Sequence, residues 1–283
     1  MLKDVTVIIP TYNKHFRLLF TLESLRLQTE IPNILVIDDG SNDDTEKTIQ
    51  KYKNKLDISY LYQQNRGRSH ARNLGLKNCV TEYVIFCDDD VILPSNFIEE
   101  HMKILTSNKN KAVHGKIWNL PFLSFFADPQ GIAEDESKDA IVTDVLKKYF
   151  ISLKDVSNQQ VLEETKKILG LEKLLMEVEK VNLKEWKFLY CTGGNFSCKT
   201  GLIKEVGCFD ETLDFKWGCE DIELGYRLQM AGTEFIYSNE AYNYHISHYR
   251  YNYEEQLIYS FNKFYSKYRD DKILVILHRL LGH

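Results

Sequence analysis

The first hundred residues alternate short apolar, β-branched runs with segments of helical spacing. This alternation is typical of a parallel sheet with crossover helices, because parallel neighbours cannot be joined by a tight turn. The first two runs are apolar almost throughout, as expected of strands covered on both faces. We predict a doubly wound α/β unit with strands at 5–9, 34–37, 58–62 and 83–87 and helices at 16–27, 43–52 and 68–76.

The middle of the chain follows a different pattern. Pro121, Pro129 and Gly131 indicate a loop after Trp118. A segment rich in Lys and Glu, with regularly spaced leucines, follows from about 133 to 187, which predicts helices without strands.

Strand patterns return in the last third of the chain, where they are expected to complete the sheet. A helix is predicted before the stop signal Ala231-Gly232, and the C-terminal tail is predicted to be helical. The predicted strands are 194–198, 234–237 and 242–245, and the predicted helical segments are 219–230 and 253–281.

Composition excludes several classes of protein. The 14 glycines and 5 prolines in 283 residues exclude collagen-like and low-complexity chains. The net charge of −5 argues against a nucleic-acid-coating protein. The apolar run at residues 5–10 is too short for a signal peptide, and no stretch approaches the length of a membrane span. Six cysteines without a C-x-x-C pair predict reduced thiols and a cytoplasmic protein, at most peripheral to the inner face of a membrane.

Three carboxylates follow the predicted strand 83–87. Side chains alternate along a strand, so Asp88 and Asp90 are expected to face one point and Asp89 the other side. That point lies at the carboxyl ends of parallel strands, where ligands bind, and hard oxygen donors suit Mg²⁺ or Mn²⁺ bridging a diphosphate. A solvated acidic turn is the alternative. A calcium loop is excluded, because Leu93 occupies the position that requires Gly.

Polar residues also follow the first two strands. Asp38 and Asp39 are expected at the same sheet edge as Asp88, where a carboxylate can accept hydrogen bonds from a base or a ribose hydroxyl. Tyr12, in the segment 10–13, can stack on a base. No Gly-rich phosphate loop occurs, so dinucleotide-binding and P-loop mechanisms are excluded.

Three arginines surround a predicted helix start after the third strand: Arg66, Arg68 and Arg72. Guanidinium groups and a helix N-terminus both suit phosphate. Surface salt bridges are the alternative interpretation.

An acidic helix start follows an aromatic residue at Trp217-Gly218. Glu220 and Asp221 fall in its first turn, where the helix dipole favours ionised carboxylates. Capping would explain them, but the neighbouring Trp217 also offers a platform for a sugar while a carboxylate takes a hydroxyl proton. His245, with His248 three residues further on, can complete a metal site begun by the Asp pair.

Taken together, these segments resemble the family 2 glycosyltransferases with the GT-A fold. They occur in family order across residues 5–248. The matching segments are Pro10-Thr11-Tyr12-Asn13, Asp38-Asp39-Gly40-Ser41, Asn65-Arg66-Gly67, Ala71-Arg72-Asn73, Asp88-Asp89-Asp90, Gly193-Gly194-Asn195, and Trp217-Gly218 with Glu220-Asp221 and the downstream histidines.

The resemblance implies a nucleotide-sugar site. Thr11, Tyr12 and Asp39 would surround uracil, Arg72 would lie near the diphosphate, and Asp88 near the ribose or donor sugar. The full set implied is Pro10, Thr11, Tyr12, Asp39, Arg66, Arg72, Asp88, Asp89, Gly193, Gly194, Asn195 and Trp217.

The resemblance also implies catalytic and metal-binding roles. Asp221 matches the general base, and Glu220 would orient hydroxyl groups. Asp90, with Asp88, would bind Mn²⁺ or Mg²⁺, with His245 as the first choice for a further ligand and His248 as the alternative.

The implied protein has a Rossmann-like, mostly parallel sheet with a helical insertion and a helical tail. We expect a nucleotide-sugar-binding half at 1–118, an acceptor or partner region at 119–189, a catalytic half at 190–250 and a tail at 251–283. The implied activity is inverting, metal-dependent transfer from a nucleotide diphosphate donor, usually UDP-linked, to a saccharide or other hydroxyl acceptor, in bacterial glycan synthesis. Alternatives are a nucleotidyltransferase and a non-catalytic nucleotide-binding or scaffold module.

Overall fold

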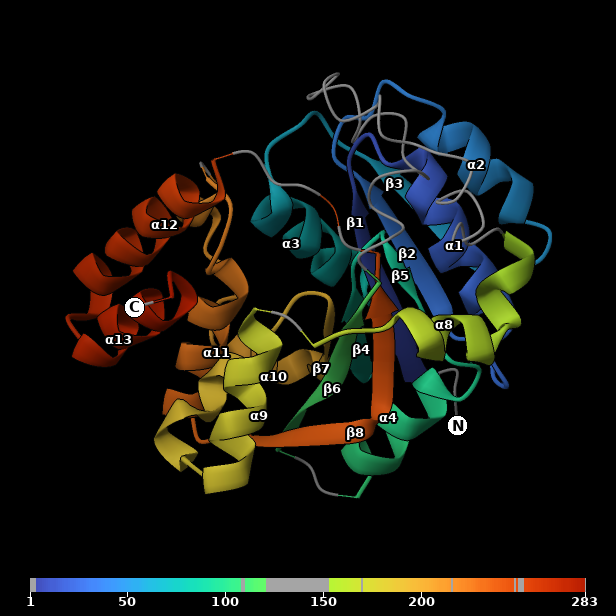
Figure 1. Cartoon of the computed structure of the whole chain (residues 1–283). Helices are drawn as coiled ribbons and strands as arrows, with labels where there is room; N and C mark the ends of the chain where they lie inside the picture. The colour runs from blue at the N-terminus through green and yellow to red at the C-terminus, as the bar shows by residue number, and fades with distance from the viewer. Residues whose placement is uncertain are drawn as a thin grey trace, which may run out of the picture.

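The computed structural model describes residues 4–107, 110–120, 153–168, 170–214, 216–246, 248 and 252–282. The predicted loop and the first part of the predicted helical segment at 133–187 lie outside these residues. Figure 1 shows the arrangement of the elements around one sheet.

The N-terminal half confirms the predicted alternation. Its four strands are parallel, with β1 hydrogen-bonded between β2 and β4, and β3 outside β2. Each predicted helix joins two consecutive strands, as crossover connections require. The elements are β1 (Val5–Thr11), α1 (His15–Arg26), β2 (Asn33–Asp38), α2 (Thr45–Tyr52), β3 (Ile58–Tyr62), α3 (Arg68–Asn78) and β4 (Tyr83–Cys87).

The sheet becomes mixed beyond β4. In the described part of the chain its order is β3-β2-β1-β4-β7-β6-β8-β5, and β7 is antiparallel to both of its neighbours. Three elements between β4 and the predicted loop had not been predicted: β5 (Val91–Ile92), α4 (Phe97–Leu105) and β6 (Lys111–Asn119). Two short helices after β7 had not been predicted either, α10 (Thr200–Glu205) and η4 (Glu211–Leu213). β7 (Asn195–Lys199) matches its prediction, whereas the two predicted strands at 234–245 are one strand, β8 (Glu234–His245).

The helices of the second half lie beside the sheet or outside the elements that cover it (Figure 1). The segment before β7 is not free of strand pairing, because Lys167 and Asn119 exchange two backbone hydrogen bonds of 2.8 Å. The predicted helical tail is two helices, α12 and α13, which lie together beyond α11 (Figure 1). These elements are η2 (Leu153–Ser157), α8 (Gln159–Thr165), α9 (Leu171–Val181), η3 (Lys184–Tyr190), α10 (Thr200–Glu205), η4 (Glu211–Leu213), α11 (Glu220–Met230), α12 (Tyr253–Tyr268) and α13 (Asp271–Leu280).

The core lies on both faces of the sheet. Alternate residues of β1 enter different apolar clusters, Val7 and Ile9 on one face and Ile8 on the other, as the pleat requires. One cluster includes residues of α1, α2 and α4, and the other includes residues of α3, α9 and α11 to α13. Each described helix is too short or too polar to cross a membrane.

Candidate active site

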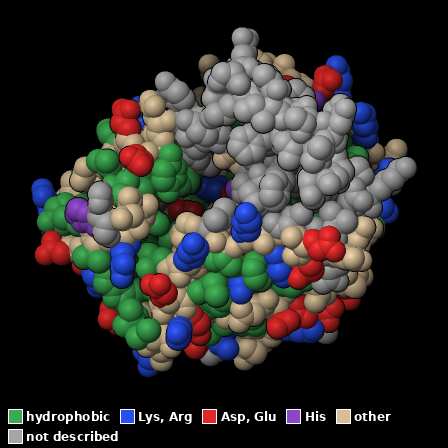
Figure 2. Space-filling model, viewed as in Figure 1, with side chains coloured by type: hydrophobic (Ala, Val, Ile, Leu, Met, Phe, Trp, Pro, Cys, Tyr) green, Lys and Arg blue, Asp and Glu red, His purple; other side chains and the backbone are tan. Residues whose placement is uncertain are grey.

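The site lies where β1, β2 and β4 end. A cavity of about 910 Å³ opens there, and Figure 2 shows it as a hollow in which acidic and basic side chains are visible. Fifteen of the side chains and glycines predicted from the sequence line it: Pro10, Thr11, Tyr12, Asp39, Arg72, Asp88, Asp89, Asp90, Gly193, Gly194, Trp217, Glu220, Asp221, His245 and His248.

The acidic triplet is arranged differently from the prediction. Asp88 contacts Arg72 at 3.3 Å, whereas Asp89 and Asp90 both contact the ammonium group of Lys14. The predicted alternation fails because β4 ends at Cys87 and the next residues form a turn. Burial raises the pKa of Asp89 to about 6, with Lys14 opposing the shift.

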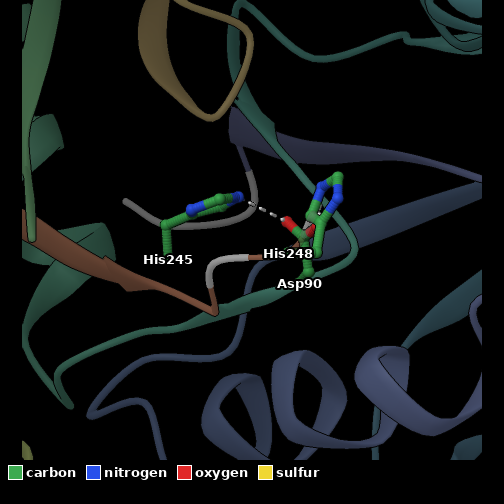
Figure 3. A group of neighbouring side chains, drawn as sticks. All are labelled: Asp90, His245 and His248. Atoms are coloured by element: carbon green, nitrogen blue, oxygen red, sulfur yellow. Dashed lines mark ion pairs between the residues drawn. The ribbon is translucent and has the colours of Figure 1, made fainter. Parts of the chain in front are cut away.

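Asp90 lies beside two histidines from the end of β8 and the residues after it (Figure 3). Its Oδ1 is 3.5 Å from Nε2 of His245, and its Oδ2 is 3.4 Å from Nε2 of His248. Asn119 Oδ1 contacts Nδ1 of His245 at 3.1 Å, which leaves Nε2 toward Asp90. Although burial alone would raise it, the pKa of Asp90 is well below its usual range because Lys14 and the histidines favour the carboxylate.

This cluster fits a divalent metal. Oδ1 of Asp90 is buried and has no hydrogen-bond partner, and three ligand atoms from Asp90, His245 and His248 lie within 4.8 Å of one another. Carboxylate and imidazole together suit Mn²⁺ and similar ions. Burial lowers the pKa of His245, which favours the neutral ligand form. Asp88 is not in the cluster, so its predicted part in metal binding is not supported by this arrangement.

Arg72 joins the two sides of the cavity. Its guanidinium donates to Glu220 Oε1 at 2.8 Å and to Asp88 Oδ1 at 3.3 Å, and its side chain is only 2 % exposed. Burial alone would lower the pKa of Arg72, but Glu220 and Asp88 raise it further above its usual value. A Cβ at Gly193 would lie 2.1 Å from Nη2 of Arg72, so the backbone at Gly193 can approach only because it is glycine.

Asp221 lies next to this ion pair at the start of α11. Its Oδ2 accepts a 2.8 Å hydrogen bond from the backbone N–H of Gly193, and its Oδ1 accepts one from Ile222. Burial and the neighbouring Glu220 raise the pKa of Asp221 to about 6. A carboxylate with this pKa is ionised at neutral pH and is a stronger base than an ordinary aspartate.

The carboxylates after β2 have structural partners. Asp39 accepts hydrogen bonds from the backbone N–H groups of Arg66 and Gly67 and from the side chain of Gln63. It therefore holds the segment 63–67 while lining the cavity. Asp38 instead accepts from Tyr60 and Ser41. Tyr12 is 46 % exposed at the cavity.

Two predicted residues lie elsewhere. The side chain of Arg66 is exposed and does not line the cavity. The backbone N–H of Arg66 donates to Asp39. Asn195 is fully buried under the site, where it contacts His101 and donates to the carbonyl of Ala241. Neither residue lines the cavity in this structure.

The N-terminus of α3, one part of the predicted phosphate site, already has a partner. The carboxylate of Asp214 accepts hydrogen bonds from the backbone N–H groups of Ser69 and His70, at 2.8 and 3.0 Å. An acidic side chain 145 residues away in sequence therefore occupies the position where a phosphate would bind.

Several residues of the site were not predicted from the sequence. Lys14 directly follows the segment 10–13, and Arg17 is a charged residue within a predicted amphipathic helix, so both carried a signal. Arg68, by contrast, was predicted as one of the three arginines suited to phosphate, and it lines the cavity with its guanidinium 5.9 Å from the centre of the Trp217 ring. Other missed lining residues come from distant segments and carried no local signal: Asn119, Glu172, Asn243, Tyr253 and Gln256.

The chain resembles known glycosyltransferases in sequence. Residues 6–122 match the family described as Glycosyl transferase family 2. An uncharacterized glycosyltransferase, YfnE, of Bacillus subtilis is 28% identical over 260 residues, which cover 86% of this chain and 64% of that protein. Chondroitin synthase of Pasteurella multocida is 30% identical over 250 residues, covering 85% and 24%. The chain thus spans less than two thirds of the length of these relatives.

Solved structures share the fold at low sequence identity. The mannosyltransferase PcManGT from Pyrobaculum calidifontis, in complex with GDP-Man and Mn²⁺, has a TM-score of 0.61 at 19% identity, covering 98% of this chain and 69% of that one. TarS from S. aureus, in complex with UDP, has a TM-score of 0.60 at 18% identity, covering 99% and 71%. The fold is that of the GT-A glycosyltransferases, and residues 6–122 are similar to glycosyl transferase family 2.

Proposed function

We propose that this protein transfers a sugar from a nucleotide diphosphate donor, a UDP-sugar in the first instance, to a hydroxyl acceptor with inversion at the anomeric carbon. One observation carries the proposal. Asp90 with its two histidines and Asp221 with its Arg72–Glu220 neighbours line the same cavity. A site for the leaving nucleotide and a base for the incoming alcohol therefore share one space.

The donor would lie along the carboxyl ends of β1 and β4. Tyr12 offers a ring face for the base, and the buried Arg72 offers positive charge for the diphosphate. Two structural relatives support a nucleotide ligand, since PcManGT was solved with GDP-Man and Mn²⁺ and TarS with UDP. The choice of UDP rests on the resemblance of the motifs.

A metal ion would be held by Asp90, His245 and His248. When bound, it would neutralise negative charge that grows on the diphosphate as the sugar leaves. Arg72 supplies a fixed positive charge from the protein itself, and it is held by Glu220 and Asp88 before any ligand arrives. Such preorganised charge stabilises a developing anion without rearrangement.

Asp221 is the proposed general base. Its carboxylate takes the proton of the acceptor hydroxyl as the acceptor oxygen forms a bond to the anomeric carbon. The bond from that carbon to the phosphate oxygen breaks, and its electron pair leaves with the nucleotide diphosphate. The Gly193 and Ile222 amides hold the carboxylate in place. Attack from the face opposite to the leaving group gives inversion.

We place acceptor binding on the side of the cavity formed by α9 and α12. Glu172 and Leu175 of α9, and Tyr253 and Gln256 of α12, line this part of the cavity. This supports the interpretation of the segment 119–189 as an acceptor region, with 1–118 holding the donor and 190–250 supplying the base.

The test is donor hydrolysis and transfer with a panel of UDP-, GDP- and dTDP-sugars in the presence of Mn²⁺. We expect slow hydrolysis of one UDP-sugar by the full chain and its loss in Asp221→Asn, with UDP binding retained by calorimetry. Wild-type turnover in Asp221→Asn would remove Asp221 from its role. Pyrophosphate release from UTP and a sugar phosphate would instead support a nucleotidyltransferase.

A further inference from the structure

The side chain of Lys14 contacts two buried carboxylates of the site, Asp89 and Asp90. Lys14 precedes α1, and its Nζ lies 3.2 Å from Oδ1 of Asp89 and 2.8 Å from Oδ2 of Asp90. The two carboxylate side chains are 6 % and 2 % exposed, whereas the lysine side chain is 29 % exposed. The ammonium group thus occupies part of the space beside the Asp90 carboxylate in which a metal ion would bind.

A second cation lies beneath the same carboxylate. Arg17 Nη1 is 3.8 Å from Oδ2 of Asp90, and the arginine side chain is only 2 % exposed. The same Nη1 donates to the carbonyl of Ile246 at 3.5 Å, and Ile246 N–H donates to the backbone of Asp90 at 2.8 Å. Arg17 is therefore a fixed positive charge that contacts both Asp90 and Ile246, which lies between the two histidines in sequence.

The charges around Asp90 make the binding of a divalent ion depend on the positions of the neighbouring cations. Asp89 and Asp90 carry two negative charges, and Lys14 and Arg17 return two positive ones. A divalent ion at Asp90 would be repelled by both cations at short range in a buried setting. Arg17 is enclosed and cannot leave, but Lys14 has a flexible, partly exposed side chain that can.

We propose that Lys14 is an internal counter-cation that competes with the divalent ion for Asp90 and is released to the diphosphate of the donor. The nucleotide then brings negative charge that both Lys14 and the metal can share, so each ligand favours the binding of the other. This inference rests on the proposed function for the presence of a metal and a nucleotide diphosphate. It makes Lys14 a positioning residue that couples the two bindings.

The experiment measures Mn²⁺ binding, not turnover. Free Mn²⁺ is followed by electron paramagnetic resonance in titrations of the full chain, with and without UDP. In the wild type we expect UDP to tighten Mn²⁺ binding by about tenfold, within the usual range of coupling between sites. In Lys14→Met we expect Mn²⁺ alone to bind about tenfold more tightly, and the effect of UDP to shrink by the same factor.

Two further variants separate charge from structure. Lys14→Arg keeps the positive charge and is expected to retain weak, UDP-dependent Mn²⁺ binding. Lys47→Met removes an exposed lysine that pairs with Asp44 on α2, and it is expected to bind Mn²⁺ like the wild type. Circular dichroism and thermal melts are used to check that each variant is folded.

Several results would overturn the inference. Unchanged or weaker Mn²⁺ binding by folded Lys14→Met would do so, as would equal gains in Lys14→Arg. If Lys14→Met does not fold, the wild type still decides, because a Mn²⁺ affinity that UDP leaves unchanged contradicts the proposed coupling. Donor hydrolysis is assayed separately, so transferase activity with uncoupled Mn²⁺ binding would refute the role of Lys14 and leave the proposed function standing.

Discussion

Replacement of Asp221 by Asn should stabilise the fold while abolishing transfer. Burial and the Glu220 anion raise the pKa of Asp221 to about 6 in the folded protein, from 3.8 in an unperturbed carboxyl. The folded-state pKa is the higher one, so the stability that this group contributes is fully present below about pH 4. It is lost as the pH rises through about 6. Above that pH the ionised Asp221 destabilises the folded state, whereas an uncharged Asn does not.

The pKa shift sets the magnitude. A shift of about two units corresponds to about 3 kcal/mol at pH 8, once both states are ionised. At pH 4.5 the unfolded state is already partly ionised, which leaves about 1 kcal/mol. The asparagine also weakens one of the hydrogen bonds from Gly193 and Ile222, but this cost is nearly independent of pH. The advantage of Asp221→Asn should therefore grow by about 2 kcal/mol from pH 4.5 to pH 8.

The assay is urea unfolding of wild type and variant at several pH values between these limits, with transfer measured in parallel. Transfer should fall by about 10²- to 10⁴-fold, as is usual when a general base is removed. A stability difference that stays constant or falls with increasing pH would refute the interpretation of Asp221 as a buried, destabilised base.

Asp43→Asn is the matched control, with the opposite sign. Burial alone would raise the pKa of Asp43, but hydrogen bonds from Thr45 and His15 lower it below the unperturbed value. Its contribution to stability is therefore present above the unfolded pKa and lost as the pH falls through the folded one. Asp43→Asn should be less stable than the wild type at pH 8, and this deficit should shrink in acid.

Three further substitutions test the site. Glu220→Gln removes the carboxylate partner of the buried Arg72, so the free energy of unfolding should fall by about 3 kcal/mol. The pKa of Asp221 should fall as well, which moves the acidic limb of the kcat/KM profile to lower pH. An acidic limb that does not move would contradict this. Gly193→Ala places a Cβ 2.1 Å from Arg72 and should weaken UDP binding about tenfold in calorimetry, whereas equal affinity would show that Arg72 does not contact the nucleotide. His245→Ala should weaken Mn²⁺ binding by about tenfold or more, and an unchanged affinity would exclude His245 as a ligand.

The N-terminal fold was predictable because its information is local. The strands Ile58–Tyr62 and Tyr83–Cys87 have the bounds expected from their runs of aromatic and aliphatic residues between turn signals, although only the second is buried. The elements β5, α4, β6, α10 and η4 were missed. Of these, β5 has only two residues and depends on pairing with β8 for its existence, so no periodicity could reveal it.

The site was predictable as a set of residues but not as a set of contacts. Asp88, Asp90 and Asp221 were found because they follow strands or start a helix at one sheet edge. Their partners depend on the turn after β4 and on pairs such as Arg72 with Glu220, which are 148 residues apart in sequence. A local pattern contains no information on such pairs.

The backbone pairing of Asn119 with Lys167 has a consequence for how this protein can diversify. Asn119 also lines the cavity, so the pairing holds the two ends of the intervening segment together beside the site. A closed loop can change length at small entropic cost, because the cost rises only with the logarithm of its length. A change in the number of residues between Asn119 and Lys167 should therefore cost little closure entropy, provided that Val156 and Leu162, which pack with Ile92 of β5 and Tyr244 of β8, are kept.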